Sequence, residues 1–127
     1  PDWGLDHRGV AIRLPETSGP GARLEHRISG ADVNPYLVLT AILGGMLYGL
    51  ENDLPLLPPL GPKDQSTTQR LTHDWLTAIE AFRASALARE LLGADYHHVY
   101  CAVKDDEAAQ LTRIIPPAEY RAYLSRL

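Results

Sequence analysis

Cysteine is nearly absent from this sequence, which carries one such residue, Cys101, among 127 residues. A single cysteine cannot form an internal disulfide, so packing must hold the chain together, and we expect a reducing, cytoplasmic location. The opening residues, 1–4, lack both the basic and the apolar stretch of a signal peptide, which agrees with that expectation.

Positive charge is also scarce over the chain as a whole. Twelve lysines and arginines stand against sixteen aspartates and glutamates, and the formal net charge is -4. Nucleic-acid-binding surfaces are normally basic, so this balance argues against a nucleic-acid partner. Arginine is nevertheless dense at the beginning of the chain, at positions 8, 13, 23 and 27.

Long uncharged runs are limited to residues 33–50, which approach the lower length limit of a membrane-spanning helix. Asn34, Pro35 and three glycines interrupt this run and no basic residue flanks it, so we expect no membrane partner. Asn34 can cap a helix and Pro35 suits its first position. Since the segment is apolar on nearly every side, it predicts a buried helix over residues 34–50.

Two extended segments precede that helix. Residues 8–14 are rich in β-branched side chains and end at Pro15, while residues 23–29 alternate in polarity and end at Gly30. A Gly- and Pro-rich turn over residues 16–22 separates them. The pattern over residues 1–30 therefore predicts two strands that lie side by side in one sheet.

The second half of the chain changes character. Residues 51–69 form a Pro-rich connector that we expect to lie over a surface or to link subdomains. Residues 70–127 are predicted to be helical, with a first helix ending at Gly93, a second beginning at Asp95, and a short third after two prolines. The predicted fold is one α+β domain over residues 1–127, with about four helices in all.

The run from Arg23 to Arg27 carries the most chemical information. Side chains alternate faces along a strand, so Arg23, Glu25 and Arg27 point the same way and His26 points the other way. Guanidinium groups bind phosphate oxygens at two points, and a carboxylate can help to hold Mg²⁺. The alternative is an exposed salt-bridge ladder that contributes little to stability, and the residues alone leave both readings open.

Arg8 and Arg13 would add two more cations to this face if the two strands are neighbours. Because five residues separate them, they cannot share one face of an ideal strand, so a bulge or a strand end must lie between them. Such a cluster suits a polyphosphate accompanied by a divalent cation, and it could stabilise the charge of a phosphoryl transfer.

Several motifs, in the same order along the chain, resemble elements of the glutamine synthetase family. Residues 5–15 resemble its Asn-Arg-(Ser/Thr)-x-x-(Ile/Leu)-Arg-(Ile/Val)-Pro element, and residues 23–27 follow with the pattern Arg-x-Glu-x-Arg. Residues 32–37 match its (Asp/Ser)-x-Asn-Pro-Tyr-Leu helix start. The family's closing helices resemble residues 100–104 and 119–124, so the similarity spans essentially the whole chain.

The resemblance implies an enzyme that activates the γ-carboxylate of glutamate with ATP, giving an acyl phosphate that ammonia or an amine attacks. By position, Arg8 and Arg27 match catalytic arginines at the reacting phosphate, and Arg27 also lies near the glutamate substrate. Arg13 and Arg23 match arginines that contact the ATP phosphates. Glu25 matches a carboxylate ligand of one active-site Mg²⁺ or Mn²⁺.

Two positions depart from the family pattern. His7 stands where the family usually has Asn, directly before Arg8, which puts the local geometry of that arginine in question. His26 gives the form Glu-His-Arg, which looks more like the branch that ligates polyamines or other amines than like the ammonia-using enzymes. The amine substrate is therefore left open.

The resemblance also implies what a chain of this extent lacks. In the family, the other metal-binding glutamates, a metal-binding histidine and the amine site precede the position of Pro1, and the two strands belong to a larger antiparallel sheet. One carboxylate cannot hold the two or three metal ions that the reaction needs, so we expect this chain alone to be inactive. The family forms double-ring dodecamers, which implies a homo-oligomer.

Two other functions remain as alternatives. The first is a non-catalytic glutamine synthetase-like protein with a structural or regulatory role, and the second is a free-standing anion-binding module. His97 and His98 do not add a metal site, because neighbours on a helix point about 100° apart, and we expect them at the surface or in a cap. We expect Cys101 to be a small buried apolar residue.

Overall fold

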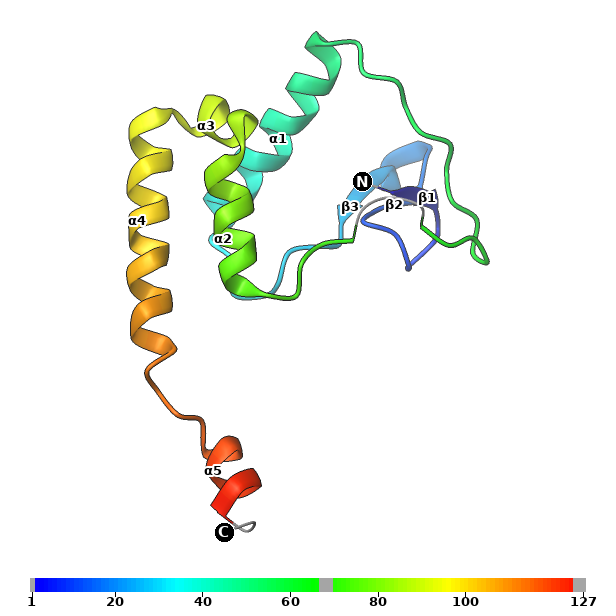
Figure 1. Cartoon of the computed structure of the whole chain (residues 1–127). Helices are drawn as coiled ribbons and strands as arrows, with labels where there is room; N and C mark the ends of the chain where they lie inside the picture. Colours follow the sequence, from blue (N-terminus) through cyan, green and yellow to red (C-terminus); the bar gives the residue numbers. More distant parts are fainter. Residues whose placement is uncertain (1, 67–69, 125–127) are drawn as a thin grey trace. The chain divides into compact units, whose positions relative to one another are not determined.

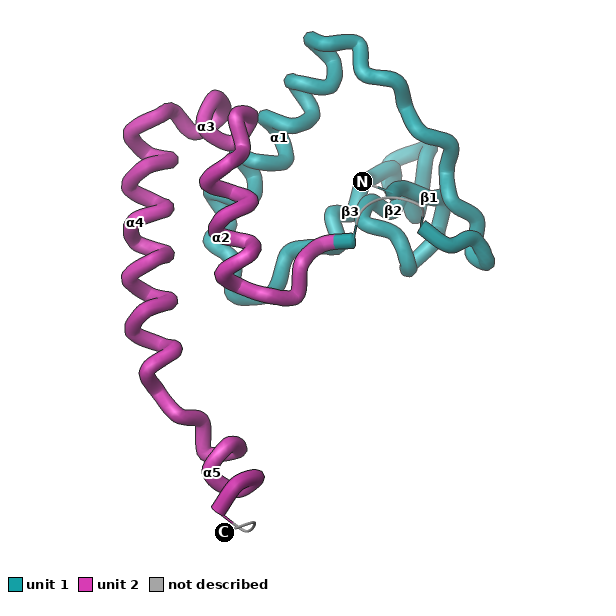
Figure 2. Tube along the Cα trace, viewed as in Figure 1, with its two compact units in different colours: residues 1–70 teal, residues 71–127 magenta. Residues whose placement is uncertain are grey.

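The computed structural model of the chain describes residues 2–66 and 70–124 (Figure 1). Its contacts group the chain into two compact units, residues 1–70 and residues 71–127 (Figure 2). The boundary coincides with the end of the Pro-rich connector, where the predicted C-terminal helices begin. A single domain over the whole chain stays a prediction.

The first unit begins with a three-stranded sheet in the order β1-β2-β3. Its strands are β1 (Trp3–Leu5), β2 (Ile12–Glu16) and β3 (Arg23–His26). The two predicted strands correspond to β2 and β3, and they pair in the antiparallel direction as neighbours. The short strand β1, which pairs with β2 in the parallel direction, was not predicted.

The predicted bounds of the first strand, residues 8–14, are wrong. Residues 8–11 form a turn, and β2 begins only at Ile12 and continues through Pro15 to Glu16. Proline has no N–H to donate within a sheet, but the register of β2 against β3 shifts between Arg13 and Glu16, and such irregularities accommodate proline. Pro15 therefore lies inside the strand instead of ending it.

Helix α1 (Pro35–Glu51) begins where the sequence predicts. The Asn34 Oδ1 atom accepts hydrogen bonds from the backbone N–H groups of Tyr36 at 3.0 Å and Leu37 at 3.3 Å. These bonds satisfy two of the N–H groups that a helix start leaves without partners.

The prediction that α1 is buried is wrong for this chain. No residue of the helix is buried, and Tyr36 and Leu50 are 80% and 79% exposed. One side of α1, including Val38 and Ile42, faces the sheet, whereas Leu39, Leu43 and Leu47 are more than half exposed. The composition of α1 showed that the helix needs to be covered on several sides, but it did not show which segments cover it.

Across the two described stretches, no helix combines the length and the apolar character that a membrane crossing requires.

The connector after α1 contacts the free edge of β1 through Leu57 and Leu60. Trp3 Nε1 donates to the Leu57 carbonyl at 2.6 Å, and the Leu60 N–H donates to the Trp3 carbonyl at 2.8 Å. A Cβ atom on Gly4 would come within 2.6 Å of the Leu60 oxygen, so only glycine permits this close approach.

The described part of the second unit, residues 71–124, contains four helices: α2 (Trp75–Ala84), α3 (Ala86–Leu92), α4 (Ala94–Leu111) and α5 (Pro117–Tyr123). The single helix predicted before Gly93 is in fact two, because Ser85 is extended and its Oγ accepts from the Ala88 N–H at 3.1 Å. The described helices thus number five instead of about four.

The core of the second unit forms where α2 and α4 pack together. Ile79, Cys101 and Ala108 are buried there, which confirms the prediction for Cys101. His97 is also buried, so the surface or capping role expected for it is wrong. Its Nε2 lies 3.0 Å from the Phe82 carbonyl oxygen and its ring stacks on the Phe82 ring, so a hydrogen bond accompanies its burial.

Candidate functional site

The sheet of the first unit brings charged side chains together through its register. Arg13 on β2 lies opposite Glu25 on β3, and Glu16 lies opposite Arg23. Since Arg23 and Glu25 are two residues apart on one strand, they share a face, and Arg13 meets them from the neighbouring strand.

Glu25 is the centre of this group. Arg13 Nη1 donates to Glu25 Oε2 at 2.8 Å, Arg23 Nη2 lies 3.3 Å from Oε1, and Arg27 Nη1 lies 3.7 Å from Oε2. One carboxylate therefore contacts three guanidinium groups. We call Arg13, Arg23, Arg27 and Glu25 the arginine cluster, and it contains four of the five site residues that the sequence predicts.

Arg13 is the most firmly held member of the arginine cluster. Its side chain is 13% exposed, and its second terminal nitrogen, Nη2, donates to Asp6 Oδ1. The hydrogen bond from Arg13 lowers the pKa of the Glu25 carboxyl, and the charges of Arg13 and Arg23 act in the same direction. The bonds to Glu25 and then to Asp6 raise the pKa of Arg13 in turn. Both groups are therefore ionised at neutral pH.

The rest of the arginine cluster is open to solvent. The side chains of Arg23 and Arg27 are 56% and 35% exposed, and that of Glu25 is 28% exposed. The three guanidinium groups carry three positive charges, and the carboxylates of Glu25 and Asp6 carry two negative charges. One positive charge is therefore uncompensated. The site can therefore attract an anion with Arg23 and Arg27 while Arg13 stays fixed beneath them.

The donor set fits phosphate better than a free metal ion. Arginine forks match phosphate oxygens, whereas both oxygens of Glu25 already contact guanidiniums. In the part of the chain that the structure describes, no three His, Cys, Asp or Glu residues are placed to hold a metal ion together. A divalent cation here would need phosphate oxygens and further carboxylates beside Glu25.

Arg8 is separate from the arginine cluster. It lies in the turn between β1 and β2, it is exposed, and no hydrogen bond or ion pair joins it to another described residue. The strand end that the five-residue spacing requires between Arg8 and Arg13 is present, because β2 begins only at Ile12. The structure thus brings three of the four predicted arginines together.

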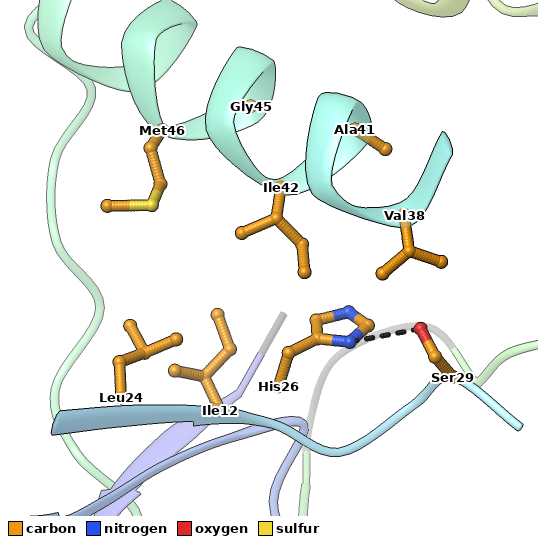
Figure 3. Close-up of a pocket in the computed structure, with 9 residues that line it drawn as sticks. All are labelled: Ile12, Leu24, His26, Ser29, Val38, Ala41, Ile42, Gly45 and Met46. Carbon is orange, nitrogen blue, oxygen red and sulfur yellow. Dashed lines mark hydrogen bonds between the residues drawn. The ribbon is translucent and has the colours of Figure 1, made fainter. Parts of the chain in front are cut away.

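The opposite face of the sheet is apolar and faces α1 (Figure 3). Between them lies a cavity of about 400 Å³, lined by Ile12 and Leu24 from the sheet and by Val38, Ile42 and other residues of the helix. His26 lines this cavity too, on the side away from Glu25, as strand alternation predicts. Its Nδ1 lies 3.1 Å from Ser29 Oγ.

One residue of the site escaped the sequence analysis. Asp6 also holds the guanidinium of Arg13, yet its residue type and local pattern are those of an ordinary surface acid. Its place depends on β1, which at three residues is too short to show an alternating pattern. The only available signal was its position two residues before Arg8, inside the first motif.

Comparison with known proteins identifies the family. Residues 1–123 match the family described as "Glutamine synthetase, catalytic domain". The chain is 37% identical to gamma-glutamylputrescine synthetase PuuA of Escherichia coli (strain K12) over 124 residues, which cover 92% of this chain and 25% of that protein. It is 34% identical to glutamate–isopropylamine ligase of a Pseudomonas species over 126 residues, 96% of this chain and 28% of that protein.

A glutamine synthetase of Methanosarcina mazei is 28% identical over 134 residues, covering 98% of this chain and 30% of that protein. The chain thus spans between a quarter and a third of the length of these three relatives. The family match covers nearly every residue, and the arginine cluster lies inside the matched segment. The chain therefore belongs to the glutamine synthetase family and corresponds to part of its catalytic domain.

Proposed function

We propose that this chain contributes the phosphate-binding arginines of an ATP-dependent ligase, which joins the γ-carboxylate of glutamate to ammonia or an amine through an acyl phosphate. The observation that carries the proposal is the contact of Glu25 with three arginines on a solvent-open face of the sheet. Family membership supports it, because two of the relatives described above are named gamma-glutamylputrescine synthetase and glutamate–isopropylamine ligase.

Each site residue has a part in this proposal. Arg13 and Arg23 contact the phosphates of ATP, and Arg27 stabilises the charge that develops on the transferred phosphoryl group. Arg8 acts with Arg27 at the reacting phosphate. Glu25 is a ligand of one Mg²⁺ or Mn²⁺, and such an ion, when bound, neutralises phosphate charge during the transfer.

The charges of the arginine cluster suit a nucleotide that arrives with its metal ion. In the cluster, the only counter-charges of Arg23 and Arg27 come from Glu25. Phosphate oxygens can replace Glu25 as the partner of these guanidiniums, and a cation can replace them as the partner of the carboxylate. Arg13 keeps its contact with Asp6 in either case and stays in position.

The substrate class is an amine or ammonia, and His26 does not select between them by contact. It lies on the face of the sheet that carries the cavity under α1, away from the arginine cluster. Selection of the amine must therefore come from residues outside this group. The relatives named for putrescine and isopropylamine make those two amines the first candidates to test.

This chain alone is proposed to be inactive, since Glu25 is the only carboxylate in the arginine cluster. The complete enzyme is proposed to be a cytoplasmic homo-oligomer. The test compares the 127-residue chain with the longest product of its reading frame, measuring ADP release with ATP, glutamate, Mg²⁺ or Mn²⁺, and ammonia, ethanolamine, putrescine or isopropylamine. We expect amine-dependent ADP release only from the longer product, and release by the chain alone would contradict the proposed inactivity.

A non-catalytic, structural or regulatory protein is the second candidate. The observation in its favour is Arg8, which has no contact with the arginine cluster and follows His7, where the family usually has Asn. This candidate predicts a folded, assembled protein that releases no ADP with any of the four nitrogen donors. Loss of the acidic metal ligands from the longer reading frame would point to the same conclusion.

A further inference from the structure

The guanidinium of Arg13 contacts two acids, Glu25 and Asp6. Asp6 Oδ1 accepts from Arg13 Nη2, while Arg13 Nη1 donates to Glu25 Oε2 at 2.8 Å. Asp6 follows β1, Arg13 lies on β2 and Glu25 lies on β3, so three consecutive segments of the sheet region meet at one guanidinium. Asp6 is not among the five residues matched to functional positions of the family.

The backbone of Asp6 is in an unusual conformation. Its φ of +45° lies in the left-handed region, where Asp and Asn occur more often than other residues with side chains but still rarely. Its N–H donates to the Leu14 carbonyl at 3.0 Å, which extends the pairing of β1 with β2 beyond the strand itself. Strained backbone of this kind concentrates at functional sites.

Asp6 and Glu25 differ in which arginines they contact, so their charges have different effects on the site. Glu25 contacts three arginines, and in the proposed function it turns to a metal ion. Asp6, whose side chain is 74% exposed, contacts Arg13 alone among the members of the arginine cluster. When Glu25 is engaged elsewhere, Asp6 is the acid that still orients Arg13 and offsets its charge.

We propose that Asp6 is a positioning residue for Arg13, which holds this guanidinium in the orientation that the phosphates of ATP require and limits the positive charge of the site. Asp6 itself contacts no nucleotide. This inference rests on the proposed function, because it assigns Asp6 a role in placing Arg13 against phosphate. Two measurable consequences follow, one on turnover and one on charge.

The first test is Asp6→Asn in the longest product of the reading frame. Asparagine keeps the size of the side chain and tolerates the left-handed backbone, so the substitution removes mainly the charge. We expect kcat to fall about tenfold, because a neutral amide oxygen holds the Arg13 guanidinium less firmly than a carboxylate does. The KM for ATP should stay equal or fall, since the site gains one uncompensated positive charge. A merely structural role would not lower KM.

Asp53→Asn is the matched control. Asp53 has a φ of +48° and, with Asp6, makes up the non-glycine residues of positive φ in the described ranges. It follows the C-terminal end of α1, has no hydrogen bond or ion pair to the arginine cluster in the described ranges, and should leave kcat and KM unchanged. If Asp6→Asn also keeps both constants within twofold of the parent protein, the proposal is overturned.

The second test needs no catalysis. Inorganic triphosphate is titrated by calorimetry into the longest product of the reading frame and into its Asp6→Asn variant, each at 50 and 200 mM salt. Asp6→Asn should bind triphosphate roughly threefold more tightly at low salt, and should lose more of that affinity on added salt than the parent does. Equal affinities and equal salt dependence in the two proteins would overturn the role of Asp6. If Asp6→Asn altered the salt dependence of triphosphate binding but the parent protein released no ADP, only the proposed ligase function would be contradicted.

Discussion

The two compact units of this chain differ in how they use their apolar residues. In the second unit, α2 and α4 pack together and bury Ile79, Cys101 and Ala108. In the first unit, Val10 is the one apolar side chain counted as buried within the described ranges, while α1 leaves Leu43 and Leu50 largely exposed. The first unit instead carries the arginine cluster. Both units expose large apolar side chains, but the second has a small buried core between two helices, whereas the first carries the arginine cluster.

The largest expected effect is on the core of the second unit. Ile79→Ala removes a side chain that is 7% exposed, and it should destabilise this unit by about 2–5 kcal/mol. The two tryptophans allow the units to be observed separately, since Trp3 lies in the first and Trp75 in the second. Urea unfolding followed by Trp75 fluorescence in a Trp3→Phe background should shift to lower urea.

The corresponding change in the first unit is Leu50→Ala, which truncates a side chain that is 79% exposed. It should change the stability of this chain by less than about 0.5 kcal/mol, as observed through Trp3 in a Trp75→Phe background. A loss as large as that of Ile79→Ala would contradict the contrast drawn between the units. It would mean that α1 is covered in solution.

The next effect concerns activity. Arg13→Lys keeps the positive charge but removes the fork that joins Glu25 to Asp6. We expect kcat/KM of the longest product of the reading frame to fall about a hundredfold in the ADP-release assay, because one preorganised donor is lost. The folded fraction should not change.

Arg83→Lys in the second unit is the control for that substitution. Arg83 also bridges two acids, with Nη2 at 2.6 Å from Asp105 Oδ1 and Nε at 3.4 Å from Glu80 Oε1. Because this bridge lies within the second unit and includes no residue assigned to the phosphate site, we expect unchanged turnover. Equal losses from Arg13→Lys and Arg83→Lys would show that the activity follows general stability and not the charged face of the first unit.

A smaller effect is expected at the start of α1. Asn34→Ala removes the acceptor of the Tyr36 and Leu37 N–H groups, and it should cost about 1 kcal/mol in the unfolding transition followed by Trp3. Asn52→Ala at the other end of the helix should cost less, because the Asn52 backbone N–H still donates to the Tyr48 carbonyl. Equal effects would contradict the capping role of Asn34.

The arginine cluster could be predicted because its geometry follows from local rules. Strand alternation places Arg23, Glu25 and Arg27 on one face, and the short loop between β2 and β3 favours antiparallel neighbours. The start of α1 was equally accessible, since Asn34 and Pro35 are both helix-start signals with a physical cause.

The features that escaped prediction depend on contacts instead of local pattern. The Asp6 contact requires β1, and the exposure of α1 depends on which segments are available to cover it. The break at Ser85 carried a signal, a capping serine, but the apolar periodicity continued past it and suggested one helix. Burial of His97 likewise required knowledge of Phe82, whose carbonyl oxygen and ring it contacts.

The smallest expected effect is on how the stability of each unit depends on acid pH. The hydrogen bond from Arg13 lowers the pKa of Glu25 below its ordinary 4.5, and a hydrogen bond from the Thr77 hydroxyl is the largest cause of the lowered pKa of Asp74, the cap of α2. Each carboxylate therefore binds a proton more readily in the unfolded chain. Its stabilising contribution is complete above the unfolded pKa and is lost as the pH falls through the folded one.

Glu25→Gln should thus flatten the acid dependence of the unfolding transition that Trp3 reports and leave that of Trp75 unchanged. Asp74→Asn should do the reverse, because Asp74 accepts from the Thr77 N–H at 2.7 Å within the second unit. The measurement is urea unfolding from about pH 5 downward to about pH 3, a range that contains the ordinary pKa values of the two groups, 4.5 for Glu25 and 3.8 for Asp74. If either substitution flattened both transitions equally, the units would unfold as one, and the division between a helical unit with its own small core and a unit that carries the charged site would fail.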